Sequence, residues 1–413
     1  MDIDEQERID AVNRHLKGDK SVDICKDANR SKKWLIGWVN RFKTGEEEWY
    51  KSQSRAPKQH GRKTNEEIES VIVNIRKALM EGNDHESKYL GVGADTIQYR
   101  MNKLGFSDDE IPSASTIKRI VKGHGLKVNK RERYKRIKSK KRYTLLNPTQ
   151  IDEMYQVDFV GPRFIKGYGP ISSLHLIDVV SNRVHVEQFN SKSMDNVIAF
   201  LIRHLSGNPI PRYLQLDNGM SFIGNLNPNN PRRFSRFVRL CLYVGIEVVF
   251  IAPSCPWMNG SIESFNGWFG SKFWDKDIFA DLEDMRTMSL HFVDQYNDLS
   301  TWKKRDKGLE HIKPVRMLKN AAEIDLDKLP LTEGQVHFIR QVDTEGQINV
   351  LNEDFKVGEE FISEYVWSTV CTRKQKMEAY YRAQDQNVAM LIKEFDYTLS
   401  VEVEHIRNDI WKT

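Results

Sequence analysis

The hydrophobic pattern of the chain changes at residue 154 from helical spacing to alternation, and this change constrains the fold more than any other feature. In residues 155–160, Tyr155, Val157 and Phe159 alternate with Gln156, Asp158 and Val160, and this alternation is typical of a β-strand. Further strands are expected over residues 174–180, 184–189, 213–216 and 248–251. Helical patterns that begin at Ser193 and Ser261 lie between or after these strands. The order predicts an α/β core with a mixed sheet covered by helices, over residues 151–318.

A second group of short strands follows a helix that is expected from Leu282 to about Tyr296. These strands are expected within residues 336–342, 347–351, 366–370, 377–381 and 388–392. The segment Asp343-Thr344-Glu345-Gly346 is typical of a hairpin turn between the first two. The pattern predicts a small β-barrel-like C-terminal domain over residues 325–413, which contains no evident chemistry of its own.

Two all-α units are expected before the core, at residues 1–51 and 65–126, with a polar linker at 52–64 between them. The last helix of the first unit has Ser31 as its cap, and Ser113 or Ser115 caps the last helix of the second. Apolar residues occupy one face of each helix, which is typical of a helix-turn-helix that enters a DNA groove but also of an ordinary amphipathic helix. The residues expected to contact DNA are Lys32, Lys33, Asn40, Arg41, Lys118, Arg119 and Lys122.

A dense basic tract lies in the segment 127–150 that leads into the core. Its only acidic residue between Lys127 and Arg142 is Glu132, although the whole chain carries a net charge of only +5. Such a tract can follow a phosphate backbone, or it can be a solvated linker that becomes ordered only on DNA. The uneven charge indicates a polyanionic partner. The expected contacts are Lys130, Arg131, Arg133, Lys135, Arg136, Lys140, Lys141 and Arg142.

Composition narrows the class of protein further. A chain of 413 residues is too long for one ordinary core, and 39% hydrophobic residues are enough to fill several. The four cysteines lie far apart without zinc-ligand spacing, so neither a disulfide framework nor a zinc finger is expected. We find no secretory signal and no apolar run of about twenty residues, and therefore expect a cytoplasmic protein without a membrane partner.

Three acidic residues stand in positions that suit metal-dependent phosphoryl transfer. Asp158 lies inside an apolar strand, where an unpaired charge is costly to bury. Asp217 ends the strand Tyr213-Leu214-Gln215-Leu216, and Glu263 lies in the first turn of a helix. Taken singly, Asp217 can be a turn residue and Glu263 a helix-capping residue. The order strand Asp, strand-end Asp, helix Glu is more specific, because two divalent ions need hard oxygen ligands on rigid elements.

At these positions the sequence resembles the DDE integrase core that retroviral integrases and bacterial insertion-sequence transposases share. The three matching segments are Tyr155-Gln156-Val157-Asp158-Phe159, Leu216-Asp217-Asn218-Gly219 and Trp257-Met258-Asn259-Gly260-Ser261-Ile262-Glu263-Ser264-Phe265-Asn266. Asp178 with Ser181-Asn182-Arg183 is similar to the turn after that core's second strand, and Tyr296-Asn297 with Lys313-Pro314 to the end of its bacterial version. The absence of an N-terminal zinc-ligand cluster makes the bacterial branch the nearer match.

The resemblance implies a ribonuclease-H-like fold and a transposase that cleaves and joins DNA with two Mg²⁺ or Mn²⁺ ions per active site. Asp158, Asp217 and Glu263 would be both the catalytic residues and the metal ligands, and Asn218, Asn259 and Asn266 would position them or form turns. Asp152 and Asp178 lie nearby in the sequence and are further ligand candidates. The expected partners are double-stranded DNA at element ends and target, and further copies of the chain in a homo-oligomer on DNA. The sequence leaves open whether an accessory protein is also required.

Two departures from the family pattern are visible. The interval between Asp217 and Glu263 is longer than usual, which an inserted surface loop at residues 226–233 explains. Ser264 and Gly267 replace basic residues that often follow the catalytic Glu, and Lys272 is the nearest substitute. Two other functions remain open on the sequence: a ribonuclease-H-like nuclease that cuts without joining, and a catalytically silent DNA-binding regulator. The presence of all three carboxylates argues against the regulator.

Overall fold

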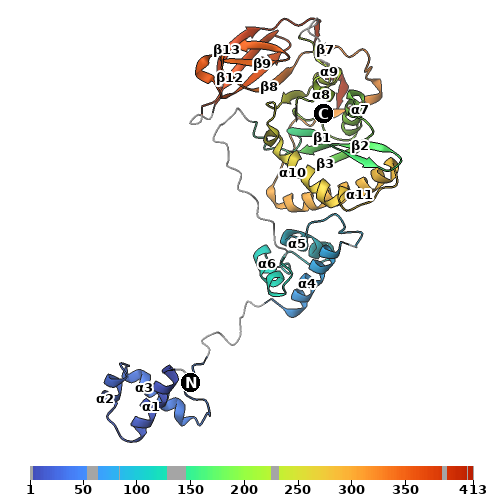
Figure 1. The fold of residues 1–413 in the computed structure, drawn as a ribbon. Helices are drawn as coiled ribbons and strands as arrows, with labels where there is room; N and C mark the ends of the chain where they lie inside the picture. The colour runs from blue at the N-terminus through green and yellow to red at the C-terminus, as the bar shows by residue number, and fades with distance from the viewer. Residues whose placement is uncertain are drawn as a thin grey trace. The chain divides into compact units, whose positions relative to one another are not determined.

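The computed structural model describes residues 3–53, 64–82, 84–127, 146–224, 232–383, 388–406 and 408–412. The chain divides into two compact units, Met1–Asn65 and Glu66–Thr413 (Figure 1). The basic tract after Lys127 lies outside the described residues, as does most of the expected linker at 52–64 and of the expected loop at 226–233.

The first unit consists of three helices, α1 (Ile3–Leu16), α2 (Ser21–Asp27) and α3 (Lys32–Lys43). They enclose a small core in which Val12, Ile24 and Leu35 are almost fully buried. Ser31 caps α3 as expected, because its side chain accepts a hydrogen bond of 3.2 Å from the Trp34 N–H.

The second unit begins with another three helices, α4 (Glu66–Glu81), α5 (Ala94–Lys103) and α6 (Ala114–Gly123). Ser113 rather than Ser115 caps α6, through a hydrogen bond of 3.3 Å from the Thr116 N–H. Leu299 and Trp302 of the long helix α11 (Leu282–Lys304) complete the hydrophobic core of these helices. The three helices therefore pack directly against the rest of the second unit.

Tyr89, which precedes α5, attaches this three-helix group to the core by polar contacts. Its hydroxyl donates to Asp277 at 2.7 Å, and its backbone N–H donates to the Gln295 side chain of α11 at 3.1 Å. Gly91 lies so close to Trp268 that a Cβ at this position would be 2.7 Å from the ring. Glycine is the residue that permits this approach.

The second unit is built on one sheet with the strand order β13-β12-β11-β8-β5-β4-β1-β2-β3. Its first half contains β1 (Met154–Ile165), β2 (Gly169–Asp178), β3 (Val184–Phe189), β4 (Tyr213–Leu216) and β5 (Glu247–Phe250). β1, β2 and β3 pair antiparallel, whereas β1, β4 and β5 run parallel. This agrees with the mixed sheet that the sequence predicts.

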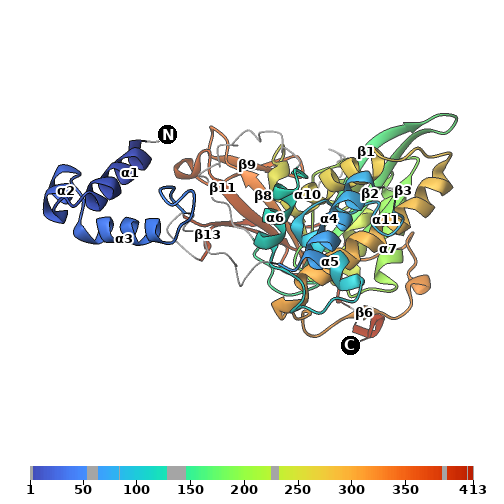
Figure 2. The same ribbon diagram turned by 90° about the horizontal axis from the view of Figure 1, so that it is seen from below.

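Helices cover both faces of this sheet (Figures 1 and 2). On one face, α7 (Met194–Leu205), α8 (Met220–Ile223) and α9 (Arg236–Tyr243) pack on the side that contains Val157, Leu214 and Phe250. On the other, α10 (Gly260–Phe269), a π-helical turn (Gly270–Trp274) and α11 pack through Phe265, Phe269 and Phe292. Within the described residues, no helix is long and apolar enough to cross a membrane.

The C-terminal strands continue the core sheet, which corrects the expected β-barrel-like domain at residues 325–413. β8 (Gln335–Gln341) pairs parallel with β5, and β11 (Tyr365–Cys371), β12 (Lys376–Tyr381) and β13 (Met390–Asp396) follow antiparallel. The physical reason lies in β5, where Val248, Val249 and Phe250 are each 0% exposed and would leave an apolar sheet edge without a partner strand. Phe250 and Phe338 stack across this junction with ring centroids 5.2 Å apart.

Shorter elements complete the C-terminal region. The expected turn at residues 343–346 is present, with Gly346 at a positive φ, but the expected hairpin is not: β9 (Gln347–Val350) pairs with β10 (Glu353–Lys356) and not with β8. The remaining described strands are β6 (Met317–Leu318), β7 (Leu331–Thr332), β14 (Val403–Glu404) and β15 (Trp411–Lys412). All four cysteines are free thiols, as their spacing suggests.

Candidate active site

The carboxyl ends of four parallel strands, β1, β4, β5 and β8, meet along one edge of the sheet. In open α/β sheets this is the edge where ligands bind. Gln156 of β1 is paired with Gln215 of β4, so Asp158 and Asp217 each follow two residues later on the same face. The local sequence thus brings two of the three predicted acidic residues next to each other.

Asp158 is a half-buried carboxylate in an unfavourable electrostatic setting. Its pKa is raised from the usual value near 3.8 to about 6, mainly by burial and then by the nearby negative charge of Asp217. The hydrogen bond that Asn266 Nδ2 donates to Asp158 Oδ2, at 2.9 Å, acts in the opposite direction. A cation placed between the two carboxylates would relieve both the burial cost and the repulsion.

Asp217 lies just beyond the last residue of β4, as the sequence predicts. Its Oδ1 accepts a hydrogen bond of 2.9 Å from the Gly219 N–H, which closes a small turn. A Cβ on residue 219 would come within 2.9 Å of the same oxygen, so glycine is needed for this close approach. The turn leaves the second carboxylate oxygen of Asp217 without a hydrogen-bond partner among the described residues.

Glu263 lies in the first turn of α10, and this helix is fixed to the sheet beneath it. The Ile262 N–H donates to Gln156 Oε1 at 3.0 Å, and one turn later Asn266 contacts Asp158. Residues three apart on a helix are neighbours on its surface, which places Glu263 beside Asn266 above β1. In the described part of the chain the Glu263 carboxylate has no ion-pair partner, and no cluster of three His, Cys, Asp or Glu residues forms a ready metal site.

The donor set near Asp158 and Asp217 suits a hard divalent cation, since two adjacent carboxylates offer oxygen ligands and share a charge that needs neutralisation. Glu263 is on the neighbouring helix but is not gathered with the pair into a three-carboxylate cluster. The residues present therefore fit a metal through Asp158 and Asp217, and a third ligand requires Glu263 to turn toward them.

The three predicted asparagines have different surroundings. Asn266 contacts Asp158 directly and also accepts a hydrogen bond of 2.7 Å from His175 Nδ1. Asn259 is buried and accepts from Gln215 Nε2 at 2.9 Å. Asn218 donates to the Ile251 carbonyl at 2.6 Å and accepts from Arg340 at 2.9 Å. Asn266 is thus the one of the three that touches a predicted acidic residue.

Asp152 and Asp178 lie at the other end of the strands. Asp178 is paired with Tyr155 in the sheet register, and Tyr155 lies three residues before Asp158 along β1. It accepts hydrogen bonds from the Val180 and Ser181 N–H groups, while Asp152 accepts from the Tyr155 hydroxyl at 2.6 Å and contacts His311 at 2.5 Å. Asp178 thus stabilises the turn after β2, and Asp152 links the residues just before β1 to His311.

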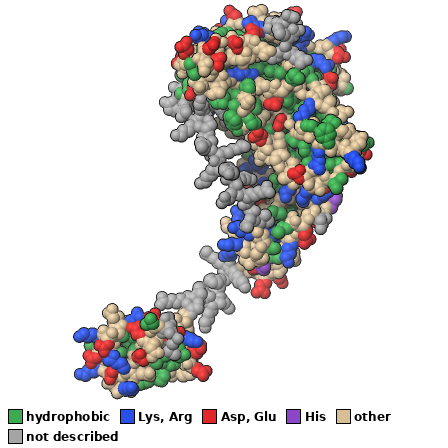
Figure 3. Space-filling view, viewed as in Figure 1, with side chains coloured by type: hydrophobic (Ala, Val, Ile, Leu, Met, Phe, Trp, Pro, Cys, Tyr) green, Lys and Arg blue, Asp and Glu red, His purple; other side chains and the backbone are tan. Residues whose placement is uncertain are grey.

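The predicted DNA-contacting residues that can be described lie on helix surfaces. Lys32, Lys33 and Asn40 are exposed on α3, whereas Arg41 is half-buried and stacks on Trp38 at 5.0 Å. Lys118, Arg119 and Lys122 are exposed on α6, and Figure 3 shows basic side chains on the surface of this helical group. The predicted contacts in the tract lie outside the described residues: Lys130, Arg131, Arg133, Lys135, Arg136, Lys140, Lys141 and Arg142.

Sequence reasoning missed four residues that shape the site. Gln156 and Gln215 are buried and hold the start of α10, the second by donating to the Met258 carbonyl at 2.8 Å. His175 is 0% exposed and lies opposite Asp158 in the register, and burial lowers its pKa to about 4, so it acts as a neutral donor to Asn266. A signal was present for the glutamines, since each precedes an acidic residue by two positions in an apolar strand. The fourth residue, Arg340, gave no such signal.

Comparison with known proteins agrees with this description. A family model described as "Integrase core domain" matches residues 244–300, which include Glu263 and Asn266. An uncharacterized 39.2 kDa protein of insertion element IS476 from Xanthomonas euvesicatoria is 26% identical over 202 residues, which are 46% of this chain and 52% of that protein. The chain thus spans about half the length of this curated relative.

Among solved structures, the catalytic core domain of HTLV-2 integrase in complex with magnesium is similar, with 17% identity, a TM-score of 0.25 and coverage of 34% of this chain and 85% of that one. The BIV integrase catalytic core has 15% identity, a TM-score of 0.25 and coverage of 39% and 90%. The integrase-core match and the insertion-element relative confirm the resemblance seen in the sequence. Residues 244–300 are thus similar to an integrase core domain, and about half of the chain is similar to an insertion-element protein.

Proposed function

We propose that the protein is a DNA transposase that binds the ends of a mobile element, cleaves them and joins them to target DNA. The observation that carries the proposal is the side-by-side placement of Asp158 and Asp217, with Glu263 on a helix fixed to the same strand. The similarity of residues 244–300 to an integrase core domain supports the reaction class, and so does the resemblance of this residue order to the DDE motif.

Asp158, Asp217 and Glu263 are proposed to hold two Mg²⁺ or Mn²⁺ ions, which when bound would neutralise charge on the reacting phosphate and activate its attacker. The chain's own residues do the rest. Asn266, held by the buried His175, orients the Asp158 carboxylate, and the Gly219 N–H fixes one oxygen of Asp217. Gln156 and Gln215 hold the start of α10 in register with the strands, so Glu263 can turn toward the pair without movement of the helix.

The proposed reaction is attack by water, and then by the freed 3′-hydroxyl, on DNA phosphodiesters. DNA recognition is assigned to α3 and α6 as helix-turn-helix readers, with the basic tract as a backbone contact and a second copy of the chain holding the second DNA end. Residues 1–51, 65–126 and 151–318 are the proposed recognition and catalytic domains, and the cytoplasm is the proposed place of action.

A strand-transfer assay tests the proposal. Labelled DNA from the ends that flank the gene is incubated with Mg²⁺ or Mn²⁺ and the wild type, Glu263→Gln, or the control Glu283→Gln, which changes an exposed glutamate on α11 in the same way. Joined products from the wild type and the control, but not from Glu263→Gln, support the proposal. Cleavage without joining would identify a nuclease instead, and DNA binding without either reaction would identify a regulator.

A further inference from the structure

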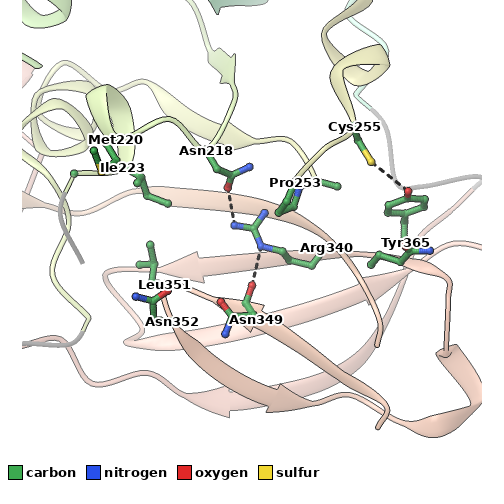
Figure 4. Close-up of a pocket in the computed structure, with 13 residues that line it drawn as sticks. Asn218, Met220, Ile223, Pro253, Cys255, Arg340, Asn349, Leu351, Asn352 and Tyr365 are labelled. Atoms are coloured by element: carbon green, nitrogen blue, oxygen red, sulfur yellow. Dashed lines mark hydrogen bonds between the residues drawn. The ribbon is translucent and has the colours of Figure 1, made fainter. Parts of the chain in front are cut away.

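A cavity of about 790 Å³ lies next to the carboxylate pair, at the carboxyl ends of the parallel strands. Its lining comes from the turn after β4, the segment after β5, the end of β8 and the turn between β9 and β10 (Figure 4). The register Leu216–Phe250–Phe338 continues two residues later to Asn218, Ala252 and Arg340, all of which line the cavity. A volume of this size is typical of sites that enclose a ligand.

Arg340 is the one charged side chain among the described residues that line this cavity. It is 6% exposed, and its acceptors are uncharged: the Asn349 carbonyl at 2.8 Å, the Ile339 carbonyl at 2.8 Å, the Ile251 carbonyl at 3.3 Å and Asn218 Oδ1 at 2.9 Å. Figure 4 shows the guanidinium lying between Asn218 and Asn349. No carboxylate of the described chain lies within ion-pair distance, although buried cations are normally paired.

The guanidinium has capacity left for an anion. It has five N–H donors, of which four are used by the acceptors named above. Burial lowers its pKa to about 10, so it remains charged at neutral pH. A charged donor in a place shielded from water forms stronger hydrogen bonds with an anion than an exposed one does.

We propose that this cavity binds a phosphodiester group of a DNA strand, with Arg340 as its cation and Asn218 as the link to the Asp217 turn. The inference rests on the proposed function, because it takes DNA as the substrate. It adds a DNA contact on β8, in the C-terminal region where the sequence shows no chemistry. It also assigns the C-terminal β-strands a role in holding the DNA strand that enters the site at Asp158 and Asp217.

The test measures binding of the full chain to an end-sequence duplex in which single phosphates are replaced, one at a time, by uncharged methylphosphonates. We expect one linkage near the cleaved position to weaken wild-type binding by about 10-fold or more. Arg340→Gln should weaken binding to unmodified DNA, add no further loss at that linkage, and lower the slope of log affinity against log salt by about 1.

Because Arg340→Gln can disturb folding, a second pair of variants uses Met220, which lines the cavity and is 72% exposed. Met220→Glu places a negative charge at the cavity and should weaken binding more than the equally sized and neutral Met220→Gln does. Equal binding by these two variants, or unchanged sensitivity to every linkage in Arg340→Gln, would overturn the inference.

The outcomes separate this inference from the proposed function. Strand joining without a phosphate-specific effect overturns the Arg340 site alone. A phosphate-specific effect without joining overturns the transposase activity but supports the site. A chain that does not bind DNA overturns both.

Discussion

The charged form of Asp158 is unfavourable for the stability of the metal-free fold, because this carboxylate is half-buried beside the carboxylate of Asp217. The same charged form is the one that the proposed metal binding requires. The raised pKa of Asp158 means that the folded state binds a proton more tightly than the unfolded state does. Stability from this residue is therefore fully present below about pH 4 and is lost as pH rises through about 6 in the metal-free protein.

We accordingly predict that Asp158→Asn stabilises the metal-free protein at pH 7.5 by about 1 to 3 kcal/mol while it abolishes catalysis. The difference from the wild type should shrink as pH falls from 6 to 4. Thermal unfolding with a chelator, at a series of pH values, measures this. A destabilised variant at pH 7.5 would show that the carboxylate is favourably paired instead.

Asn266 donates a hydrogen bond to Asp158, and the role we propose for it is to position that carboxylate. We predict that Asn266→Ala lowers strand-transfer activity by roughly 10- to 100-fold and weakens Mn²⁺ affinity, with DNA binding unchanged. Ser264→Ala, an exposed neighbour on the same helix, is the control. Wild-type Mn²⁺ affinity in Asn266→Ala would mean that the His175–Asn266–Asp158 contact is structural only.

At the scale of elements, the junction between β5 and β8 joins the C-terminal strands to the core. Phe338→Ala removes a fully buried ring that stacks on Phe250, and should cost about 3 to 5 kcal/mol. Phe164→Ala removes a ring that is 74% exposed and should change stability by less than about 0.5 kcal/mol.

Urea unfolding of these two variants, followed by tryptophan fluorescence and by circular dichroism, checks this prediction. Because one sheet runs through the junction, the two signals should shift together in Phe338→Ala. A separate, earlier transition confined to the C-terminal region would indicate an independent domain after all.

The elements themselves were predictable because hydrophobic period and capping residues are local. Ser31, Ser113 and Ser193 cap helices as their positions indicate, and the strands around Asp158 and Asp217 lie where alternation places them. Partner choice is not local. β8 is predicted as an apolar strand from the sequence, but its parallel pairing with β5, 88 residues earlier, depends on which sheet edge remains unpaired.

The candidate site shows the same difference between local features, which the sequence predicts, and contacts between distant segments, which it does not. The three acidic residues could be proposed from the sequence because their order is specific, and the buried glutamines would follow from strand period alone. Arg340 could not be found, because its contacts with Asn218, Ile251 and Asn349 join three segments that only the fold brings together. The orientation of Glu263 likewise depends on side-chain packing, which a spacing rule does not describe.

At the scale of the whole molecule, the two compact units predict separable functions. We predict that deletion of residues 1–65 leaves a folded protein with the melting temperature of the wild-type catalytic unit, since the division falls at Asn65. The deleted protein should lose affinity for end-sequence DNA and show a shallower salt dependence. Calorimetry and fluorescence anisotropy measure the two effects, and a large drop in melting temperature would contradict the division.

The attachment of α4, α5 and α6 to α11 has a consequence for the geometry of DNA cutting. Tyr89, Gly91 and Leu299 fix these helices to the same body that carries Asp158 and Asp217. A DNA segment held by α6 would therefore meet the carboxylates at a set number of base pairs from its recognised sequence. Under the proposed function, one or two base pairs inserted between the recognised sequence and the cut position would turn the scissile phosphate to another side of the double helix. The packing of these helices would then set the spacing at the end of the element.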